Sequence, residues 1–289
     1  MVEGDHHIIK SIAREEFSRA QRRAIVSRIA HFLNPDKDKL LSFNDVKEIL
    51  KPNHQIYRGM QTVPIKLIIG SEGRYMDFNK CFDPKMDYIR GRWQSIAEAN
   101  LKDIILPPIQ LYELGGVYFV RDGNHRVSVA RSQGGELIDA EVTSLESEIK
   151  IRPGITLTEL HDAVIEYEKR IFYEETFFGD LTDCWILDFS ITGRYDVIYN
   201  HILVHKYYIN QEHDTEISFN DALVSWYNKV YLPIMKIVDE EHICAKFPKR
   251  KPSDFYVWIV KQWDFLKRRY GETYPMEDAA RAWSAQCEK

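Results

Sequence analysis

The sequence predicts an α+β protein, in which a small mixed sheet domain with flanking helices precedes a mainly α-helical carboxy-terminal domain. Two observations predict the sheet. Residues 108–114 and 117–121 have the composition of short strands, and Gly115-Gly116 between them is a strong hairpin-turn signal. A third observation predicts the helical domain, since apolar residues recur at helical spacing through most of the chain beyond residue 155.

Residues 1–54 are expected to form an amino-terminal helical segment. An arginine-rich helix is predicted over residues 8–33 from apolar residues at helical spacing, namely Ile12, Phe17, Ala20, Ile25, Ile29 and Phe32. Ser42 has the side chain of a helix N-cap, and the short helix that it begins extends to Leu50 before Pro52 ends it.

Residues 55–150 are assigned to the sheet domain. A helix is predicted near residues 93–101. After the hairpin, a helical pattern begins beside Val127, and residues 138–142 have the alternation of another strand. The order of these elements places one helix directly after the second strand of the hairpin.

Residues 151–289 are expected to form an aromatic-rich helical domain. Its predicted helices span residues 156–177, 193–210, 218–239, 252–270 and 276–286. Pro233 lies inside the third of these, and we expect it to kink or interrupt that helix because proline lacks the N–H that an interior helical position uses.

Composition predicts a folded, cytoplasmic protein without a membrane partner. The 289 residues are 44% hydrophobic and 12% aromatic, yet no apolar run approaches the roughly 20 residues that span a bilayer. The net charge of −5 disfavours extensive contact with the DNA backbone. The cysteines are widely spaced without a C-x-x-C pair, which favours reduced thiols: Cys81, Cys184, Cys244 and Cys287.

The most informative motif is D-G-N-H-R at residues 122–126, between the predicted strand and helix. Backbone N–H groups at a helix N-terminus lack intrahelical partners and carry partial positive charge, so they bind phosphate or carboxylate. Gly123 lets the backbone approach a ligand closely, Arg126 supplies a permanent positive charge, and Asp122 and His125 can move protons or hold a metal. The structural alternative is a tight turn, in which Asp122 caps the helix and Arg126 pairs with a surface carboxylate.

A strand, then D-G-N-H-R opening a helix, then a strand resembles the ParB/sulfiredoxin superfamily. Upstream, residues 63–70 and the loop 73–78 are similar to the first ParB box, although Gly73 stands where ParB commonly has proline. Since that box is an apolar strand followed by a loop, the resemblance predicts a single strand over residues 63–70. The resemblance covers roughly residues 60–146 and includes two motifs in the expected order. The whole chain also resembles a group of uncharacterised ParB-like bacterial proteins, and this wider resemblance implies no activity.

This resemblance implies a nucleotide site, with ATP, ADP or CTP phosphates against the turn and helix that carry His125 and Arg126. Sulfiredoxin chemistry needs a cysteine immediately before His-Arg, whereas Asn124 stands there, so sulfinic-acid repair is disfavoured. ParB partition proteins continue into a helix-turn-helix, and no basic helix follows the motif here. The favoured function is therefore phosphoryl transfer to a small hydroxylic substrate, or nucleotide hydrolysis, with Mg²⁺ as the natural cofactor.

Candidate roles follow from chemistry and position. The nucleotide-binding candidates are Gly123, Asn124, His125, Arg126, Ser128 and Arg74. The catalytic candidates are Asp122, His125 and Glu72. Glu72 is either a general base or part of an exposed charged loop, and the Ser128 hydroxyl either contacts phosphate or helps to satisfy backbone donors. The ligands of a metal are not specified by the sequence.

Other residues have weaker functional interpretations. Arg90 and Arg92 either add positive charge to the site or solvate a helix start, with the second role favoured. His201 and His205 have the i, i+4 spacing of a metal pair, but a packed surface is the favoured alternative. Arg194 is assigned to packing between domains in preference to phosphate binding.

Two rival functions remain at this stage. One is a DNA-associated regulator without small-molecule catalysis, in which the arginines of the first helix face DNA: Arg14, Arg19, Arg22, Arg23 and Arg28. The other is a metal-dependent nuclease, which is disfavoured because no dense carboxylate cluster surrounds the motif. A Walker A segment is absent from the sequence, which excludes ordinary P-loop chemistry.

Overall fold

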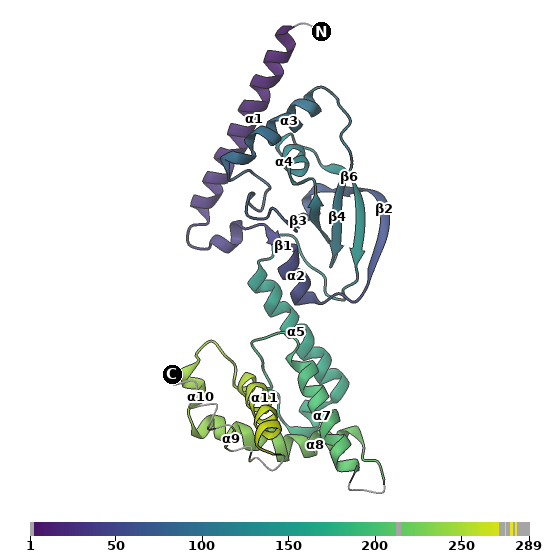
Figure 1. Ribbon diagram of the computed structural model, residues 1–289, viewed down its shortest axis with the longest axis vertical. Helices are drawn as coiled ribbons and strands as arrows, with labels where there is room; N and C mark the ends of the chain where they lie inside the picture. The colour runs from purple at the N-terminus through teal and green to yellow at the C-terminus, as the bar shows by residue number, and fades with distance from the viewer. Residues whose placement is uncertain (1–2, 212–214, 272–274, 276–277, 280, 282–289) are drawn as a thin grey trace. The chain divides into compact units, whose positions relative to one another are not determined.

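A six-stranded mixed sheet with flanking helices forms the centre of the first of two structural units (Figure 1). The computed structural model describes residues 3–211, 215–271, 275, 278–279 and 281. Its chain divides into Met1–Leu160 and His161–Lys289. The described part of the second unit consists of helices and their connections, so the α+β class predicted from the sequence is confirmed.

The strand order of the sheet is β1-β3-β5-β4-β6-β2. The strands are β1 (Leu41–Ser42), β2 (Gln55–Pro64), β3 (Ile68–Ser71), β4 (Ile109–Leu114), β5 (Val117–Asp122) and β6 (Leu137–Leu145). β5 runs parallel to β3 and antiparallel to β4, and β4 and β6 are parallel. The sheet is completed by β1, parallel to β3, and by β2, antiparallel to β6. Because β3 and β5 are parallel neighbours, the segments that follow them leave the sheet at the same edge.

The hairpin between β4 and β5 forms at the predicted place. Leu114 pairs with Val117, which leaves Gly115 and Gly116 as a two-residue turn with φ values of +63° and +86°. Two positive φ values are what this turn requires, and glycine adopts them without the strain that a Cβ introduces.

The single strand predicted over residues 63–70 is wrong. β2 ends at Pro64, a 3-10 turn spans Ile65–Leu67, and β3 begins at Ile68. The two strands pair with different neighbours, β2 with β6 and β3 with β5. Val63, Ile65 and Ile68 are all buried, so the apolar run continues through the break. Hydrophobicity alone therefore could not show that the chain moves from one strand position of the sheet to another.

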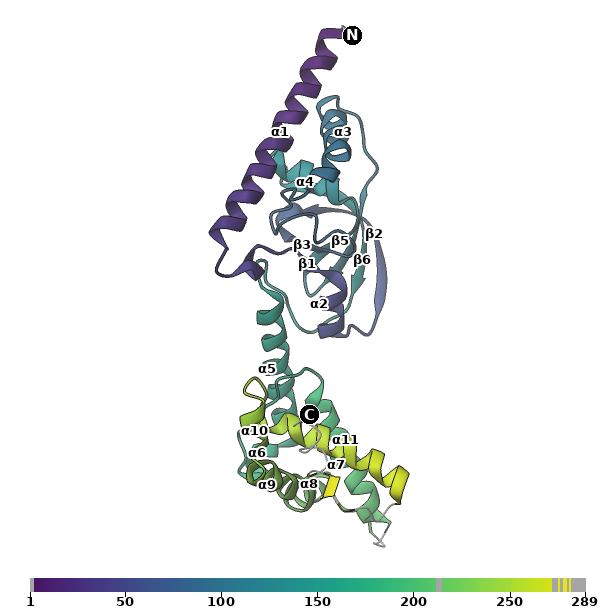
Figure 2. The same ribbon diagram turned by 60° about the vertical axis from the view of Figure 1, so that its left-hand side comes forward.

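Three helices of the first unit pack near the motif: α1 (Glu3–Ala30), α3 (Arg90–Leu101) and α4 (Asn124–Ser132). α1 lies along α3, and α3 along α4 (Figure 2). Phe17 of α1 meets Trp93 of α3 edge to face, with ring centroids 5.5 Å apart, and both side chains are fully buried. The remaining helical elements of this unit are η1 (Pro35–Asp38), α2 (Phe43–Leu50), η2 (Ile65–Leu67) and η3 (Asp87–Ile89).

The predicted cap of α2 is confirmed, since the Ser42 Oγ accepts a hydrogen bond from the Asp45 N–H at 3.4 Å. A serine at this position satisfies one of the backbone donors that the first helical turn leaves without a partner.

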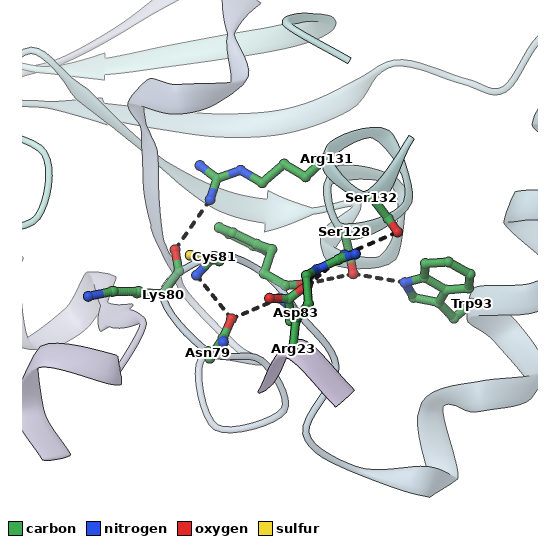
Figure 3. Close-up of polar contacts among 10 residues, drawn as sticks. Arg23, Asn79, Lys80, Cys81, Asp83, Trp93, Ser128, Arg131 and Ser132 are labelled. Atoms are coloured by element: carbon green, nitrogen blue, oxygen red, sulfur yellow. Dashed lines mark hydrogen bonds and ion pairs between the residues drawn. The ribbon is translucent and has the colours of Figure 1, made fainter. Parts of the chain in front are cut away.

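The inner side of α4 holds the loop at residues 79–83 (Figure 3). The Ser128 Oγ donates to the Phe82 carbonyl at 2.6 Å and accepts from the Trp93 Nε1 at 2.8 Å. Arg131 donates to the Lys80 carbonyl at 3.3 Å and lies over the Phe82 ring at 5.1 Å. The loop is therefore held by buried polar groups of the same helix that begins with the motif.

The same loop is closed internally and tied to α1. The Asn79 Oδ1 accepts from the Cys81 and Asp83 N–H groups at 3.0 and 2.9 Å. Arg23 of α1 pairs with Asp83 at 2.8 Å and donates to the Ser132 Oγ at 3.2 Å (Figure 3). Burial raises the pKa of Asp83, and the hydrogen bond and charge of Arg23 act against this rise.

The second unit is built around aromatic side chains. Its helical elements are α5 (Leu157–Thr176), α6 (Phe178–Thr182), α7 (Arg194–Asn210), α8 (Phe219–Trp226), a π-helix (Tyr227–Tyr231), α9 (Leu232–Glu240), α10 (Ile243–Lys246) and α11 (Pro252–Tyr270). Its core includes Phe178, Trp226 and Tyr256, and the Trp226 Nε1 donates to the Tyr256 hydroxyl at 2.9 Å.

The predicted interruption at Pro233 is confirmed. A π-helix at Tyr227–Tyr231 interrupts the α-helical pattern of the expected helix over residues 218–239, and Pro233 follows it as the second residue of α9. The backbone stays helical through this junction, but proline has no N–H to donate, so the regular α-helical hydrogen bonding cannot continue unchanged there. The expected helix at 276–286 lies for the most part outside the described residues. Among those described, no helix combines the length and hydropathy needed to cross a membrane.

The buried hydroxyl of Ser128 provides a test of this packing. We expect Ser128→Ala to lower the free energy of unfolding of the first unit by about 2 kcal/mol, because it leaves a buried carbonyl and a buried indole N–H without their partner. Urea titration measures the change as a shift of that unit's transition to lower denaturant. Ser132→Ala, on the same helix and with only one exposed hydrogen bond, is the matched control and should cost less than about 0.5 kcal/mol.

Candidate functional site

A pocket of about 140 Å³ opens where β5 ends and α4 begins. Its lining residues are Arg74, Arg92, Ile96, Asp122, Gly123, Asn124, His125 and Arg126. The parallel pairing of β3 and β5 brings the loop after β3 beside the motif, since Ser71 pairs with Val120. The five residues of D-G-N-H-R and Arg74 therefore meet in one place, as the sequence predicted.

Gly123 allows the abrupt change from strand to helix. Its φ is +105°, and a Cβ there would lie only 2.4 Å from the Ile109 Cγ2. Both the backbone angle and this close approach require glycine. The close contact is with Ile109 of β4, whereas the sequence had suggested close approach to a ligand. α4 consequently starts at Asn124 with its first N–H groups at the pocket, where the helix places partial positive charge.

His125 is a buried, neutral imidazole at pH 7. Burial, followed by the nearby positive charges of Arg92 and Arg74, lowers its pKa from 6.5 to about 4, against the opposing effect of Asp77 and Asp122. The His125 ring stands edge-on to Phe78, with centroids 5.6 Å apart. This imidazole can donate or accept a hydrogen bond, but with such a pKa it is a weak base.

Two residues that line the pocket each have a buried polar atom without a hydrogen-bond partner: the Asn124 Oδ1 and the His125 Nε2. Both residues are only 6% exposed. A buried polar atom without a partner costs roughly 1–3 kcal/mol, so it marks a position where a bound group restores the missing hydrogen bond. Two such atoms on adjacent residues at a helix N-terminus point to a polar ligand.

Two arginines provide the positive charge of the pocket. The Arg74 guanidinium donates to the Asp77 Oδ2 at 3.0 Å, and Asp77, which is buried, also accepts from the Tyr88 hydroxyl. This hydrogen bond to Asp77 raises the pKa of Tyr88. Arg92 is exposed, and within the described part of the chain its side chain makes no hydrogen bond or ion pair. Arg74 is therefore a positioned cation, and Arg92 is a cation available to a ligand.

Arg92 was given a structural role from the sequence, and the structure instead places it in the pocket. Its position one helical turn before Ile96 puts both side chains on the same face of α3, and both line the cavity. Arg90, two residues before Arg92, has a structural role, because it pairs with Asp87 at 2.6 Å and its guanidinium lies 4.9 Å from the centre of the Phe17 ring.

Arg126 lines the pocket, but its guanidinium donates its hydrogen bonds to groups of the protein itself. Its guanidinium donates to the carbonyls of Pro107 and Pro108, the latter at 2.9 Å, and to the Asp122 Oδ2 at 2.5 Å. Only 15% of its side chain is exposed, against 60% for Asp122. Asp122 does not cap α4, whose N-cap is Gly123 without a side-chain hydrogen bond. Arg126 thus fixes the segment before β4 and holds Asp122, and its loss would affect the fold as well as a ligand.

Glu72 and Ser128 are not brought into the pocket. Glu72 is half-buried, and its N–H continues the β3–β5 pairing by donating to the Val120 carbonyl at 2.9 Å, but it lies outside the lining. Ser128 faces the opposite side of α4, where Phe82 and Trp93 occupy its hydroxyl. Of its two predicted roles, the structure shows the one that satisfies polar groups of the protein.

The two histidine candidates lie in the second unit and have partners of their own. His201 contacts the Tyr256 hydroxyl at 3.1 Å, while His205 contacts the Ser225 Oγ at 3.0 Å. The described residues contain no group of three or more His, Cys, Asp or Glu arranged to hold a metal ion. The Arg194 Nε is buried without a partner.

Comparison of the chain with protein-family models, curated proteins and solved structures gives no match. The resemblance to the ParB/sulfiredoxin superfamily therefore stays a prediction that depends on the two sequence motifs. The geometry of the pocket does not depend on this resemblance.

The state of His125 can be measured directly. We expect its imidazole protons to titrate by NMR with a pKa near 4, and Arg92→Ala or Arg74→Ala to raise that value by removing a nearby positive charge. Arg58→Ala is the control, since Arg58 is exposed, lies on β2 and is outside the pocket. Titration near 6.5 in the wild type would contradict the buried, cationic environment.

The same pKa predicts how stability changes with pH. Between pH 6.5 and about 4 the unfolded chain binds the proton more readily than the folded one. The contribution of the neutral imidazole to the free energy of unfolding is therefore fully present above pH 6.5 and is lost as the pH falls toward 4. His125→Gln should remove this part of the pH dependence.

Proposed function

We propose that the pocket binds the phosphate groups of a nucleotide. The observation that carries this proposal is that the α4 N-terminus and two arginines meet at one small cavity, which is also lined by the two residues whose buried polar atoms have no partner. Helix N–H groups and guanidinium groups are the donors that proteins commonly use for phosphate. The neutral imidazole of His125 adds a donor or acceptor without further charge.

The size of the pocket limits what enters it. Sites for small molecules commonly enclose about 300–1,000 Å³, whereas this pocket holds about 140 Å³. The phosphate end of ATP, ADP or CTP would therefore lie inside, with the nucleoside outside the cavity. The contacts described here recognise phosphate and do not select a base.

A Mg²⁺ ion is compatible with the residues present. Magnesium is usually held by one or two carboxylates together with substrate phosphates and waters. Asp122 is the one carboxylate in the lining, and 60% of its side chain is exposed. Asp122 and the phosphates would hold the ion, which neutralises phosphate charge when bound.

Phosphoryl transfer to a small hydroxylic substrate, or nucleotide hydrolysis, is the activity we propose for this site. A base must lie near the attacking hydroxyl or water. Asp122 fits this role better than His125, because it is exposed at the rim whereas the imidazole is buried and weakly basic. Glu72 lies outside the lining.

The alternative of a DNA-associated regulator receives less support from the structure. The five arginines of α1 are exposed, but two already have acidic partners: Arg19 pairs with Glu15 at 3.4 Å and Arg23 with Asp83 at 2.8 Å. Salt-sensitive DNA binding without nucleotide binding would favour this alternative.

Nucleotide binding is tested by thermal stability with ATP, ADP, CTP and GTP, each with Mg²⁺. A ligand at about 100 times its Kd stabilises the folded state by about 2.7 kcal/mol. We expect Arg74→Ala and Arg92→Ala each to weaken binding by about 1.5–3 kcal/mol, because each removes a charge-assisted contact. Arg58→Ala should bind as the wild type does. If none of the four nucleotides raises the melting temperature of the wild type, the proposal fails.

Catalysis is tested separately, by release of phosphate or phosphorylated product over time between pH 6 and 9. We expect Asp122→Asn to abolish turnover while nucleotide binding persists, because the amide keeps the size of the side chain but cannot accept the proton. If Asp122 instead mainly holds Mg²⁺, metal-dependent binding weakens as well. Saturable binding by the wild type with no turnover of any nucleotide would leave a nucleotide-sensing module.

A further inference from the structure

A second, larger cavity lies beside the carboxy-terminal half of α1. It encloses about 340 Å³, within the range of small-molecule sites. It is lined by Gln21, Ala24, Ile25, Arg28, Pro35, Asp38, Lys39, Lys85 and Met86. None of these residues lines the pocket at the start of α4, so the two cavities can be studied independently.

Positive charge dominates the polar part of this cavity. Arg28, Lys39 and Lys85 contribute three cations, against the single carboxylate of Asp38. That carboxylate already accepts a hydrogen bond from the Ser27 Oγ, and Lys39 pairs with Asp36, outside the lining, at 2.7 Å. In the described part of the chain, the side chains of Arg28 and Lys85 make neither a hydrogen bond nor an ion pair.

Lys85 is the most informative of these cations. Lys85 is half-buried, and this burial lowers the pKa of its ammonium group. The negative charges of Asp38 and Asp77 oppose the decrease in pKa, whereas the positive charges of Lys39 and Arg28 add to it. A half-buried ammonium has lost part of its hydration, and among the described residues no hydrogen-bond acceptor replaces it. A bound anion would supply both the acceptor and the opposite charge.

Apart from Gln21, whose amide donates to the Asp87 Oδ1 at 3.1 Å, the rest of the lining is apolar. Ala24 and Ile25 of α1 form one part, and Pro35 and Met86 form another. Ile25 is 45% exposed and Met86 is 39% exposed, so their side chains offer surface to a ligand. A simple inorganic anion would leave this surface in water, whereas an apolar group attached to the anion would cover it.

We propose that this cavity binds a small organic anion, in which one phosphate or carboxylate group is joined to an apolar group. The anionic group lies between Arg28 and Lys85, and the apolar group packs on Ile25 and Met86. This site is separate from the proposed nucleotide pocket and does not depend on it.

Calorimetric titration of the full chain with phenyl phosphate tests the proposal. All proteins carry Arg74→Ala and Arg92→Ala, which remove two of the three arginines that line the α4 pocket; the third, Arg126, is hydrogen-bonded within the protein. We expect saturable binding, weakened about tenfold or more by Arg28→Gln and by Lys85→Gln, since each deletes a charge-assisted contact. Arg14→Gln is the matched control, because Arg14 is an exposed arginine of the same helix outside this lining, and it should change affinity less than about twofold.

Two related ligands separate charge from apolar contact. Inorganic phosphate should bind more weakly than phenyl phosphate. Ile25→Asn should reduce this difference in affinity between the two ligands. Benzyl alcohol, which lacks the charge, should not bind measurably. Methyl NMR of isoleucine-labelled protein provides a measurement independent of the cavity substitutions, in which phenyl phosphate shifts the Ile25 signal.

The proposal is overturned if phenyl phosphate does not bind, or if Arg14→Gln weakens binding as much as Arg28→Gln does. It is equally overturned if benzyl alcohol binds as well as phenyl phosphate, or if the Ile25 methyl signal does not move at saturation.

Discussion

The parallel pairing of β3 with β5 is the constraint on which the α4 pocket depends. Parallel neighbours end at the same edge of a sheet, so the loop that carries Arg74 must leave beside the motif that begins α4. The pairing even extends one residue beyond β3, through the Glu72 N–H and the Val120 carbonyl. Without this register, the cation of Arg74 and the N–H groups of α4 would not share a cavity.

The first residues of α4 and the residues of its later turns have different roles. The first residues line the pocket and have unpartnered buried polar atoms, whereas Ser128 and Arg131 satisfy carbonyls of the loop at 79–83 and of the segment at 65–68. These hydrogen bonds hold the helix in place, and this allows a start with unsatisfied polar atoms to persist at its other end. The packing of α4 thereby offsets the free-energy cost of the unpartnered buried atoms of Asn124 and His125.

Local signals in the sequence predicted the elements well. The hairpin at Gly115-Gly116, the Ser42 cap and the interruption at Pro233 each depend on one or two residues whose backbone preferences act within a single turn. The division of residues 63–70 was missed because the apolar run continues through the turn, with Val63, Ile65 and Ile68 all buried, so the hydrophobic pattern does not change where the pairing partner does.

For the site, the sequence by itself determined that D-G-N-H-R joins a strand to a helix N-terminus, because glycine, proline and helical periodicity act locally. Only the tertiary structure decided which side chains face the pocket. Arg126 turns to the carbonyls of Pro107 and Pro108, Ser128 turns inward to Phe82, and Arg92 enters the cavity from another helix. A side chain's role depends on the groups that surround it in space, and these come from segments far apart in the sequence.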